Sequence, residues 1–216
     1  MLANGRERPR KKCLSKIEAS MSSISIEING RGIATISLAG MDVVDVSVHG
    51  ALDREQKAVL NAMGGNYAEG GCGHLIWIAE RGLLPGEVLS VSLNEGCDIA
   101  TQGKTIAELY PHEEPSTKTD FSMSEDMAAE IRARPRLHER FIVQVETPSA
   151  QQAKATSDDR NTDFAFSFLW DKFRPDQVRL RLATYCLEDV LARTGGTEHL
   201  RDTVSVGDSV TFLVLQ

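Results

Sequence analysis

The most enzyme-like grouping in this 216-residue sequence is the tripeptide Cys72-Gly73-His74, with Cys97 further along the chain. A thiolate nucleophile needs a base beside it in space, and a zinc site usually has four ligands. One cysteine and one histidine separated by a single residue do not form the two well-spaced pairs of familiar zinc motifs. Cys72, His74 and Cys97 therefore stand as an alternative metal or thiol site, while the main expectation is a protein that is not an enzyme and has no cofactor.

Glycines are concentrated in residues 64–73, as in loops that bind phosphate groups. No Gly-Lys-Ser/Thr follows these glycines, and Glu69 would place a negative charge against the phosphates. A Gly-Lys-Thr does occur at residues 103–105, but Asp98 stands where the motif requires its first glycine. The sequence therefore argues against nucleotide binding.

Acidic residues gather in two polar segments that we expect to be exposed. Glu108, Glu113 and Glu114 belong to the first segment, and Asp158 and Asp159 to the second. Neighbouring exposed carboxylates are usually solvated, and when they have a function it is more often the binding of a basic partner than acid–base catalysis. These five acids are the predicted partner-binding residues.

The charge of the chain is unevenly distributed. Residues 1–20 carry six basic and two acidic side chains, so the rest of the chain has a formal net charge of −11. An acidic body repels nucleic acid and suits a basic protein partner. Residues 1–20 have no apolar periodicity, which predicts a disordered basic tail and leaves open whether translation starts at Met1 or Met21.

Two further features bear on where the protein acts. No apolar run approaches the roughly 20 residues that a membrane helix needs, and the N-terminus lacks the apolar segment of a secretory signal. The four cysteines are widely spaced, which favours free thiols. We therefore expect a cytoplasmic protein with no membrane contact. The cysteines are Cys13, Cys72, Cys97 and Cys186.

Alternating apolar residues predict most of the β-strands, because every second side chain of a strand faces the same side. The first such strand and its partner lie on either side of the turn at residues 29–32, and a third run follows, which predicts an antiparallel meander. Further alternating runs begin near residues 89, 141, 164, 178 and 210. The apolar residues of the first three runs are Ile24, Ile26, Ile28, Ala34, Ile36, Leu38, Val44, Val46 and Val48.

Capping residues and glycines predict several short helices. Asp53 and Gln56 have the spacing of a capping box, with a helix reaching Met63 and ending at Gly64-Gly65. Residues 75–81 are expected to be helical, although their apolar run also suits a strand. Other helices are expected at residues 105–110, at 187–194 and after the capping box of Ser122 and Glu125.

The two halves of the chain share an order of features. Gly64-Gly65, His74-Leu75 and Gly86-Glu87 have counterparts in the second half. We expect the paired histidines to bond backbone carbonyls at the starts of the elements that follow. The counterparts are Gly195-Gly196, His199-Leu200 and Gly207-Asp208.

The predicted fold class is α+β, with two related antiparallel sheet-plus-helix units that arose by internal duplication and share a core, since neither unit alone can cover its apolar faces. The units are residues 21–95 and 138–216, and residues 96–137 form a linker with one helix.

Residues 74–91 contain His-Leu-x-Trp followed by Gly-Glu and an alternating strand. This pattern resembles small uncharacterised bacterial proteins, several of which are suspected antitoxins or immunity factors. The resemblance covers about 20 residues in each half, and the second copy departs from it because Asp202 stands near the tryptophan position. It implies an interaction role and assigns no catalytic residues.

Three functions follow as hypotheses. The first is a protein-binding protein, specifically an immunity-type inhibitor whose acidic residues cover a basic surface of a toxin or effector. The second is an enzyme with a metal or thiol site at Cys72, His74 and Cys97. The third is a structural or assembly subunit built from the repeated unit.

Overall fold

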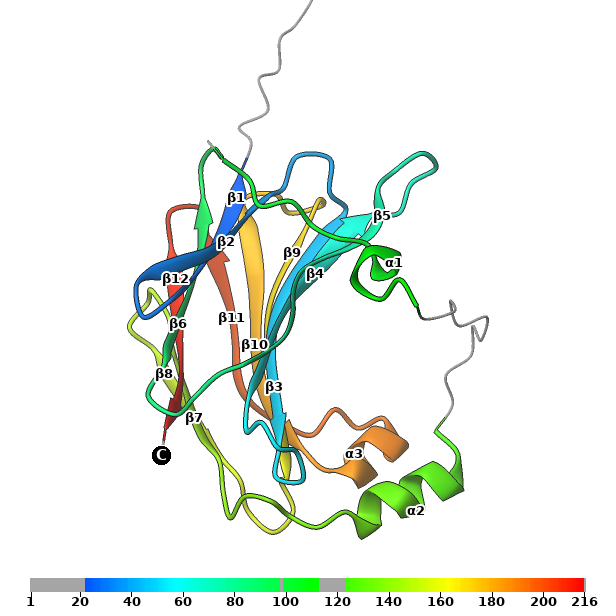
Figure 1. Ribbon diagram of the computed structural model, residues 1–216. Coiled ribbons are helices and arrows are strands. Elements are labelled where there is room, and N and C mark those ends of the chain that lie inside the picture. Colours follow the sequence, from blue (N-terminus) through cyan, green and yellow to red (C-terminus); the bar gives the residue numbers. More distant parts are fainter. Residues whose placement is uncertain (1–21, 98, 113–122, 216) are drawn as a thin grey trace, which may run out of the picture.

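The protein is a sandwich of two antiparallel six-stranded sheets, shown by the computed structural model in Figure 1, which describes residues 22–97, 99–112 and 123–215. The strands of the first sheet are β1 (Ser23–Ile28), β2 (Arg31–Ser37), β6 (Val88–Asn94), β7 (Ile142–Glu146), β8 (Gln152–Thr156) and β12 (Ser209–Leu215). Those of the second sheet are β3 (Val43–Ala51), β4 (Val59–Asn66), β5 (Gly73–Gly82), β9 (Asp163–Asp171), β10 (Gln177–Tyr185) and β11 (Thr197–Ser205). Three helices complete the described part: α1 (Ile106–Leu109), α2 (Glu125–Ala133) and α3 (Leu187–Ala192).

One hydrophobic core lies between the two sheets and draws on both halves of the chain. The alternating apolar residues of the strands point into it, as their period of two requires. In β9, for example, Phe164, Phe166 and Phe168 are buried, and the intervening residues face away from the core. Phe212 of β12 packs across the sandwich on Phe166, with ring centroids 5.3 Å apart.

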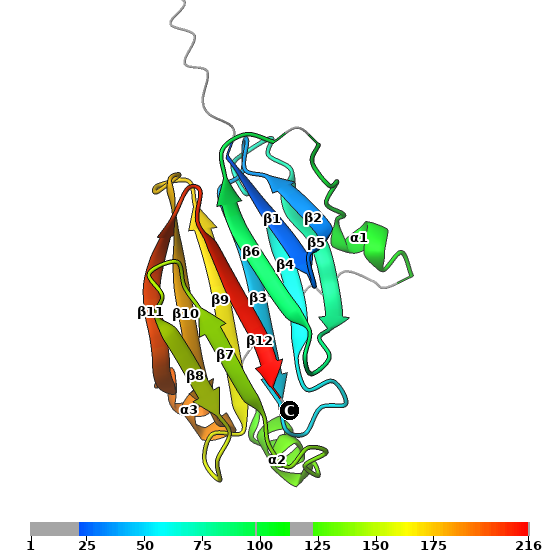
Figure 2. The ribbon, with the colours of Figure 1, turned by 90° about the vertical axis from the view of Figure 1, so that its left-hand side faces the viewer.

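Both sheets follow the same pattern of strand order. The first sheet runs β2-β1-β6-β12-β7-β8, and the second runs β11-β10-β9-β3-β4-β5. If β1 to β6 are renamed β7 to β12 and β7 to β12 are renamed β1 to β6, each sheet shows the same strand order read from its other edge. The halves of the chain meet at the central pairs β6–β12 and β3–β9 (Figure 2). Each sheet therefore contains three strands from each half.

The described structure is mostly β rather than α+β, because two segments expected to be helical are strands. Residues 59–66 form β4, and residues 73–82 form β5. Gly64 and Gly65 lie inside β4 rather than ending a helix. A side chain at Gly65 would collide with the backbone carbonyl of Gly73, so close strand approach is what requires glycine there.

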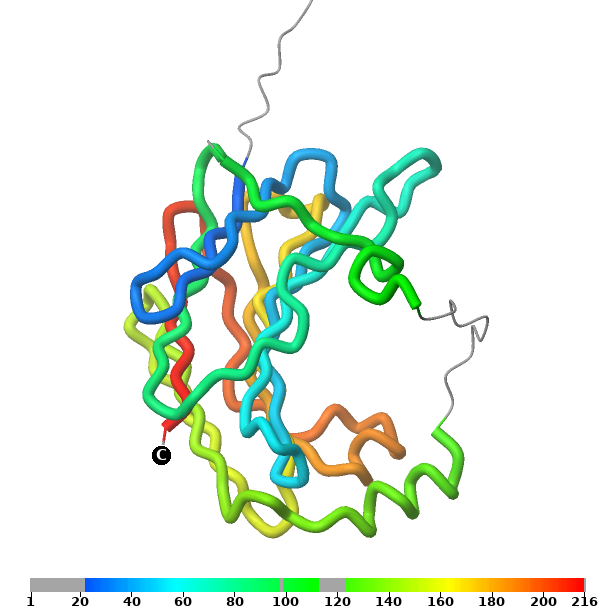
Figure 3. The backbone as a smooth tube through the Cα atoms, viewed as in Figure 1, coloured from blue at the N-terminus to red at the C-terminus, as the bar shows by residue number. Residues whose placement is uncertain are grey.

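The connection after β2 also differs from the expected meander. β1 and β2 form the predicted hairpin, but β3 crosses to the second sheet and pairs with β4 and β9. Figure 3 shows this crossing in the blue part of the chain. The short runs of β2 and β3 each have one buried face, and two sheets packed face to face cover both of those faces at once.

The helices at the other three predicted positions are confirmed. Thr105 and Glu108 form a complete capping box at the start of α1. The cap of α2 is Ser124, whose hydroxyl accepts a hydrogen bond from the Met127 amide. Ser122, which was expected to cap that helix, and the predicted basic tail both lie outside the described residues. Within the described ranges, no helix has the length and hydrophobicity to cross a membrane.

Candidate functional site

Residues of α2, α3 and two connections between strands line a pocket. The two helices lie at one end of the sandwich (Figure 1). The volume of the pocket is about 580 Å³, within the size range of ligand-binding sites in proteins. The lining combines apolar side chains with arginines and acids. The lining residues used below are Leu52, Asp53, Arg54, Ile131, Arg132, Arg134, Arg136, Asp159, Arg160, Thr162, Asp163, Tyr185, Leu187, Glu188 and Val190.

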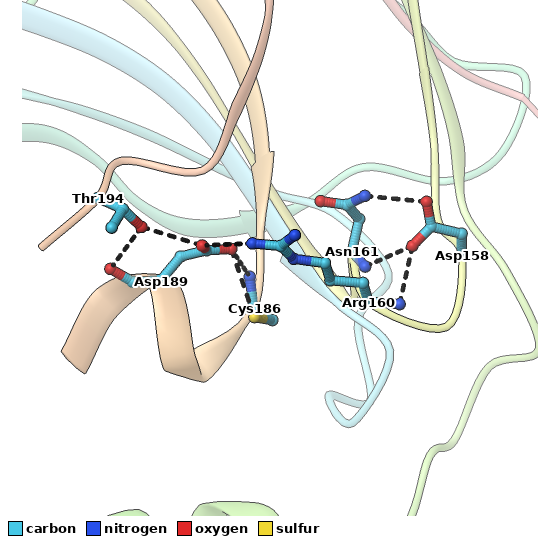
Figure 4. Close-up of polar contacts among 6 residues, drawn as sticks. All are labelled: Asp158, Arg160, Asn161, Cys186, Asp189 and Thr194. Carbon is cyan, nitrogen blue, oxygen red and sulfur yellow. Dashed lines mark hydrogen bonds and ion pairs between the residues drawn. The ribbon is translucent and has the colours of Figure 1, made fainter. Parts of the chain in front are cut away.

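Asp189 fixes the α3 wall of this pocket. Its carboxylate accepts hydrogen bonds from the Cys186 amide at 3.1 Å and the Thr194 hydroxyl at 2.9 Å, which fasten the two ends of the helix. Arg160, from the loop before β9, reaches the same carboxylate at 3.4 Å (Figure 4). These bonds hold the pKa of Asp189 below its ordinary value, chiefly through the Cys186 amide. The contact joins two walls of the pocket.

Asp158 organises the loop that carries Arg160. Its carboxylate accepts hydrogen bonds from the amides of Arg160 and Asn161 at 2.8 and 2.6 Å, and from the Asn161 side chain at 2.9 Å (Figure 4). These bonds lower the pKa of Asp158, with the Asn161 amide as the main cause. An aspartate that bonds the backbone two and three residues later stabilises a turn. This predicted partner-binding acid thus has a structural task in the loop.

Asp159 is the predicted partner-binding acid that lines the pocket. It is exposed, and its backbone carbonyl accepts a hydrogen bond from Arg136 at 3.3 Å. Partner binding through Asp158 and Asp159 stays a prediction, and the second of these residues lines the pocket.

Arg132 ties α2 to α3 on the opposite side of the pocket. Its guanidinium donates to Glu188 of α3 at 2.9 Å and to Glu125 of its own helix at 2.8 Å. These hydrogen bonds, that to Glu188 above all, raise the pKa of Arg132. Because these groups are largely exposed, their ion pairs add little stability. Their effect is to set the position of α2.

A half-buried acid lies on the inner wall of the pocket. Asp163, the first residue of β9, is the register partner of Tyr185 in β10. The Thr162 hydroxyl donates to its carboxylate at 2.6 Å. Burial raises the pKa of Asp163, and the nearby charge of Asp53 raises it further, while Arg54 lowers it. Burial and the charge of Asp163 also raise the pKa of Tyr185.

We predict that Asp163→Asn stabilises the fold at neutral pH. A carboxyl with a raised pKa in the folded state is ionised there at a cost, and an uncharged amide removes that cost. In the wild-type protein, the folded state binds more protons than the unfolded state only between the ordinary and the raised pKa of Asp163. The wild-type fold therefore loses stability as pH rises through this window, and the stability gained by Asp163→Asn grows over the same window. Below the ordinary pKa of aspartate, about 3.9, both states are protonated and the gain vanishes. Urea unfolding at several pH values measures it, and a loss of stability at pH 7 would contradict it.

Glu108, another predicted partner-binding acid, lies outside the pocket lining. Glu108 caps α1, accepting from the Thr105 amide at 2.7 Å and the Thr105 hydroxyl at 2.9 Å. These bonds lower the pKa of Glu108. Glu113 and Glu114 lie outside the described residues. Binding of a partner by these three acids therefore stays a prediction.

The alternative site lies toward the opposite end of the sandwich, in and beside the β4–β5 loop. Cys72 is exposed, and His74 shares a hydrogen bond with the Tyr67 hydroxyl at 2.9 Å. Cys97 follows β6. The described part of the chain contains no group of three or more histidines, cysteines and acids placed to hold a metal.

We predict that the purified protein holds less than about 0.2 equivalents of zinc, because a usual zinc site needs more ligands than this loop brings together. Metal analysis before and after chelation tests this, with unfolding followed in parallel. Stoichiometric zinc, or a loss of stability on chelation, would restore the Cys72, His74 and Cys97 site as the leading hypothesis.

The two histidines that the sequence predicts to be counterparts bond hydroxyl groups rather than the expected backbone carbonyls. His74 pairs with Tyr67, and His199 pairs with Thr184 at 2.8 Å. Tyr67 lies in the connection that leads from β4 to the strand of His74, β5. Thr184 lies in β10, the strand before that of His199, β11. The histidines thus have structural contacts in both halves.

The pocket end of the sandwich differs from the opposite end because helices form part of its wall. The connection after β10 contains α3, whereas the corresponding connection after β4 is a short turn. At that opposite end, Lys172 pairs directly with Asp42 at 2.6 Å. Apart from Asp159, the pocket residues escaped sequence analysis as site residues because they come from four separate segments, and the one further local signal was the arginine-rich run at residues 132–136.

Comparisons with protein-family models, with curated proteins and with solved structures gave no significant match to this chain.

Proposed function

We propose that this protein acts by binding another protein, and that the partner docks at the pocket end of the sandwich. The pocket itself carries this proposal, because its lining combines apolar side chains with charged ones, several of which are exposed. Val190 of α3, which lines the pocket, is 47% exposed, and Met127 of α2 is 40% exposed. Partly exposed apolar side chains surrounded by charges are typical of surfaces that bind proteins.

The proposed partner is basic. Outside residues 1–20 the chain has a formal net charge of −11, and Asp159, Glu125 and Glu188 are exposed around the pocket. Complementary charge speeds the encounter of two proteins and selects between partners. In its most specific form, the proposal is an immunity-type inhibitor that covers a basic toxin or effector in the bacterial cytoplasm.

The proposal includes an origin of the fold by duplication of a six-strand unit. The supporting observation is the strand order, which is preserved when the two sets of six strands are exchanged. The Gly-Gly pairs do not occupy corresponding places, because Gly64-Gly65 lies inside β4 and Gly195-Gly196 lies in the connection between β10 and β11.

Affinity capture from the native cell with three forms of the full chain tests the docking site. Val190→Trp places a bulky ring in the pocket, and Leu84→Trp makes the same kind of change at a residue that is 67% exposed and outside the pocket lining. The wild-type protein and Leu84→Trp are expected to retain the same basic protein, in a complex that weakens with salt. Val190→Trp is expected to lose it. Equal capture by all three forms, or capture of no protein, would contradict the proposal.

A further inference from the structure

The inner wall of the pocket holds a carboxylate that lacks a cationic partner. Among the described residues Asp163 forms no ion pair, and its recorded polar contact is the Thr162 hydroxyl. Asp53 adds a second negative charge nearby, against one guanidinium, Arg54. This wall therefore carries an excess of negative charge in a partly desolvated position, where an added cation would interact favourably.

Three of the arginines that line the pocket are already paired. Arg132 is held by Glu125 and Glu188, Arg134 lies 3.4 Å from Glu130, and Arg160 reaches Asp189. The lining itself holds five guanidiniums and four carboxylates. Adding the three acids outside the lining that pair with its arginines gives seven carboxylates against five guanidiniums; these acids are Glu125, Glu130 and Asp189. The pocket is thus rich in arginine, and these outside acids, not the lining alone, make the local formal charge negative.

The pocket also offers apolar surface to a long side chain. Leu187, Ile131 and Val190 line it, and Tyr185 is the register partner of Asp163 on the neighbouring strand. Lysine and arginine have apolar stems that pack on such surfaces while their charged ends meet an acid. An aromatic ring next to that acid adds a favourable contact for a cation.

We propose that the pocket receives a lysine or arginine side chain of the partner, with its charged end at Asp163 and its stem on the apolar lining. This inference rests on the proposed function, of which it names the recognised group. The exposed Asp159 of the lining would face the partner's surface around that side chain.

Titration of the full chain with capped amino acids tests the inference without the partner. The probes are Nα-acetyl-lysine methylamide, its arginine analogue, and the norleucine analogue, which keeps an apolar stem without charge. At least one basic probe is expected to bind about tenfold more tightly than norleucine, the ratio that a charge-assisted contact of about 1.4 kcal/mol gives. NMR shifts of amides near the pocket report binding.

Asp163→Asn removes the charge with almost no change of shape, and Asp45→Asn is its matched control. Asp45 lies on the same outer face of the second sheet, accepts a hydrogen bond from Ser167 at 2.6 Å, and has its pKa raised by burial, but it does not line the pocket. Asp163→Asn is expected to abolish the preference for the basic probe, and Asp45→Asn to preserve it. Because Asp163→Asn should also stabilise the fold, its loss of binding would not reflect unfolding.

Three outcomes would overturn the inference: no preference for either basic probe over norleucine, a preference that survives Asp163→Asn, or an equal loss in Asp45→Asn. Its failure is separable from that of the proposed function. If Val190→Trp loses the partner and the probes show no preference, the docking site stands and the recognised group is wrong. If the probes behave as expected and no protein is captured, the pocket binds a basic group and the protein-binding proposal fails.

Discussion

Phe212→Ala is expected to destabilise the fold by about 3–5 kcal/mol, the usual cost of removing a buried aromatic ring from a core. Phe212 is 1% exposed and contacts Phe164 and Phe166 of the opposite sheet, with ring centroids 6.1 and 5.3 Å apart. Its strand, β12, lies between β6 and β7. The cavity left by alanine would therefore open where the two halves of the chain join.

Urea unfolding of Phe212→Ala and Leu213→Ala measures this effect. Leu213 is the next residue of the same strand and faces away from the core, where it is half-buried. Its truncation is expected to cost much less, because a cavity is not created inside packed surroundings. A similar loss in both variants would show that the core between the sheets is not what stabilises this strand. A single unfolding transition is expected, since both halves share one core.

Gly50→Ala is expected to cost about 1–3 kcal/mol or more, the range for forcing extra atoms into a packed interior. A Cβ atom at Gly50 would overlap the Lys57 backbone carbonyl and lie 2.5 Å from the Phe164 ring. Neither neighbour can move freely, because one is main chain and the other is a fully buried ring. The strand end would have to shift.

Gly32→Ala is the matched control for this change. Gly32 is an exposed residue of β2, and a Cβ atom there would meet no atom within 4 Å. Unfolding measurements on both variants should show a loss for Gly50→Ala alone. Because Gly50 leads directly into Leu52, Asp53 and Arg54, the same variant is expected to weaken binding of the basic probe. An unchanged stability of Gly50→Ala would mean that the strand end adapts without cost.

The helices show how a repeated strand order yields one distinctive end. α3 follows β10, α2 precedes β7, and contacts through Arg132 and Arg160 join them to each other and to the loop before β9. At the opposite end, the loop before β3 and the turn between β9 and β10 are joined directly by the ion pair of Asp42 and Lys172. Insertions of helical segments into loops are how a common scaffold acquires a specific site.

Alternation of apolar residues was enough to predict most strands and the residues that they bury. Ile24, Ile26 and Ile28 are each less than 5% exposed, as are Phe164, Phe166 and Phe168. A period of two leaves one interpretation for such runs, because only a strand places these side chains on one face. Caps were equally informative at α1, where Thr105 and Glu108 bond each other as expected.

The same reasoning failed where apolar residues did not alternate. The capping box at Asp53 and the helical spacing of Val59, Leu60 and Met63 predict a helix that ends at Gly64-Gly65. β4 instead lies between β3 and β5 and is largely buried, so apolar residues are tolerated on both faces. Tertiary pairing overrides local preference in such strands.

By itself, the sequence determined the strands with one apolar face, the turn at Asn29-Gly30 and the acidity of the body, because each depends on neighbouring residues or on composition. Only the tertiary structure decided which strands share a sheet, and that Asp53, Asp163 and Tyr185 line one cavity with α2 and α3. Asp53 lies more than 100 positions before Asp163 and Tyr185 in the chain. Their proximity comes from the pairing of β3 with β9 and of β9 with β10, a contact between distant segments that local spacing cannot encode.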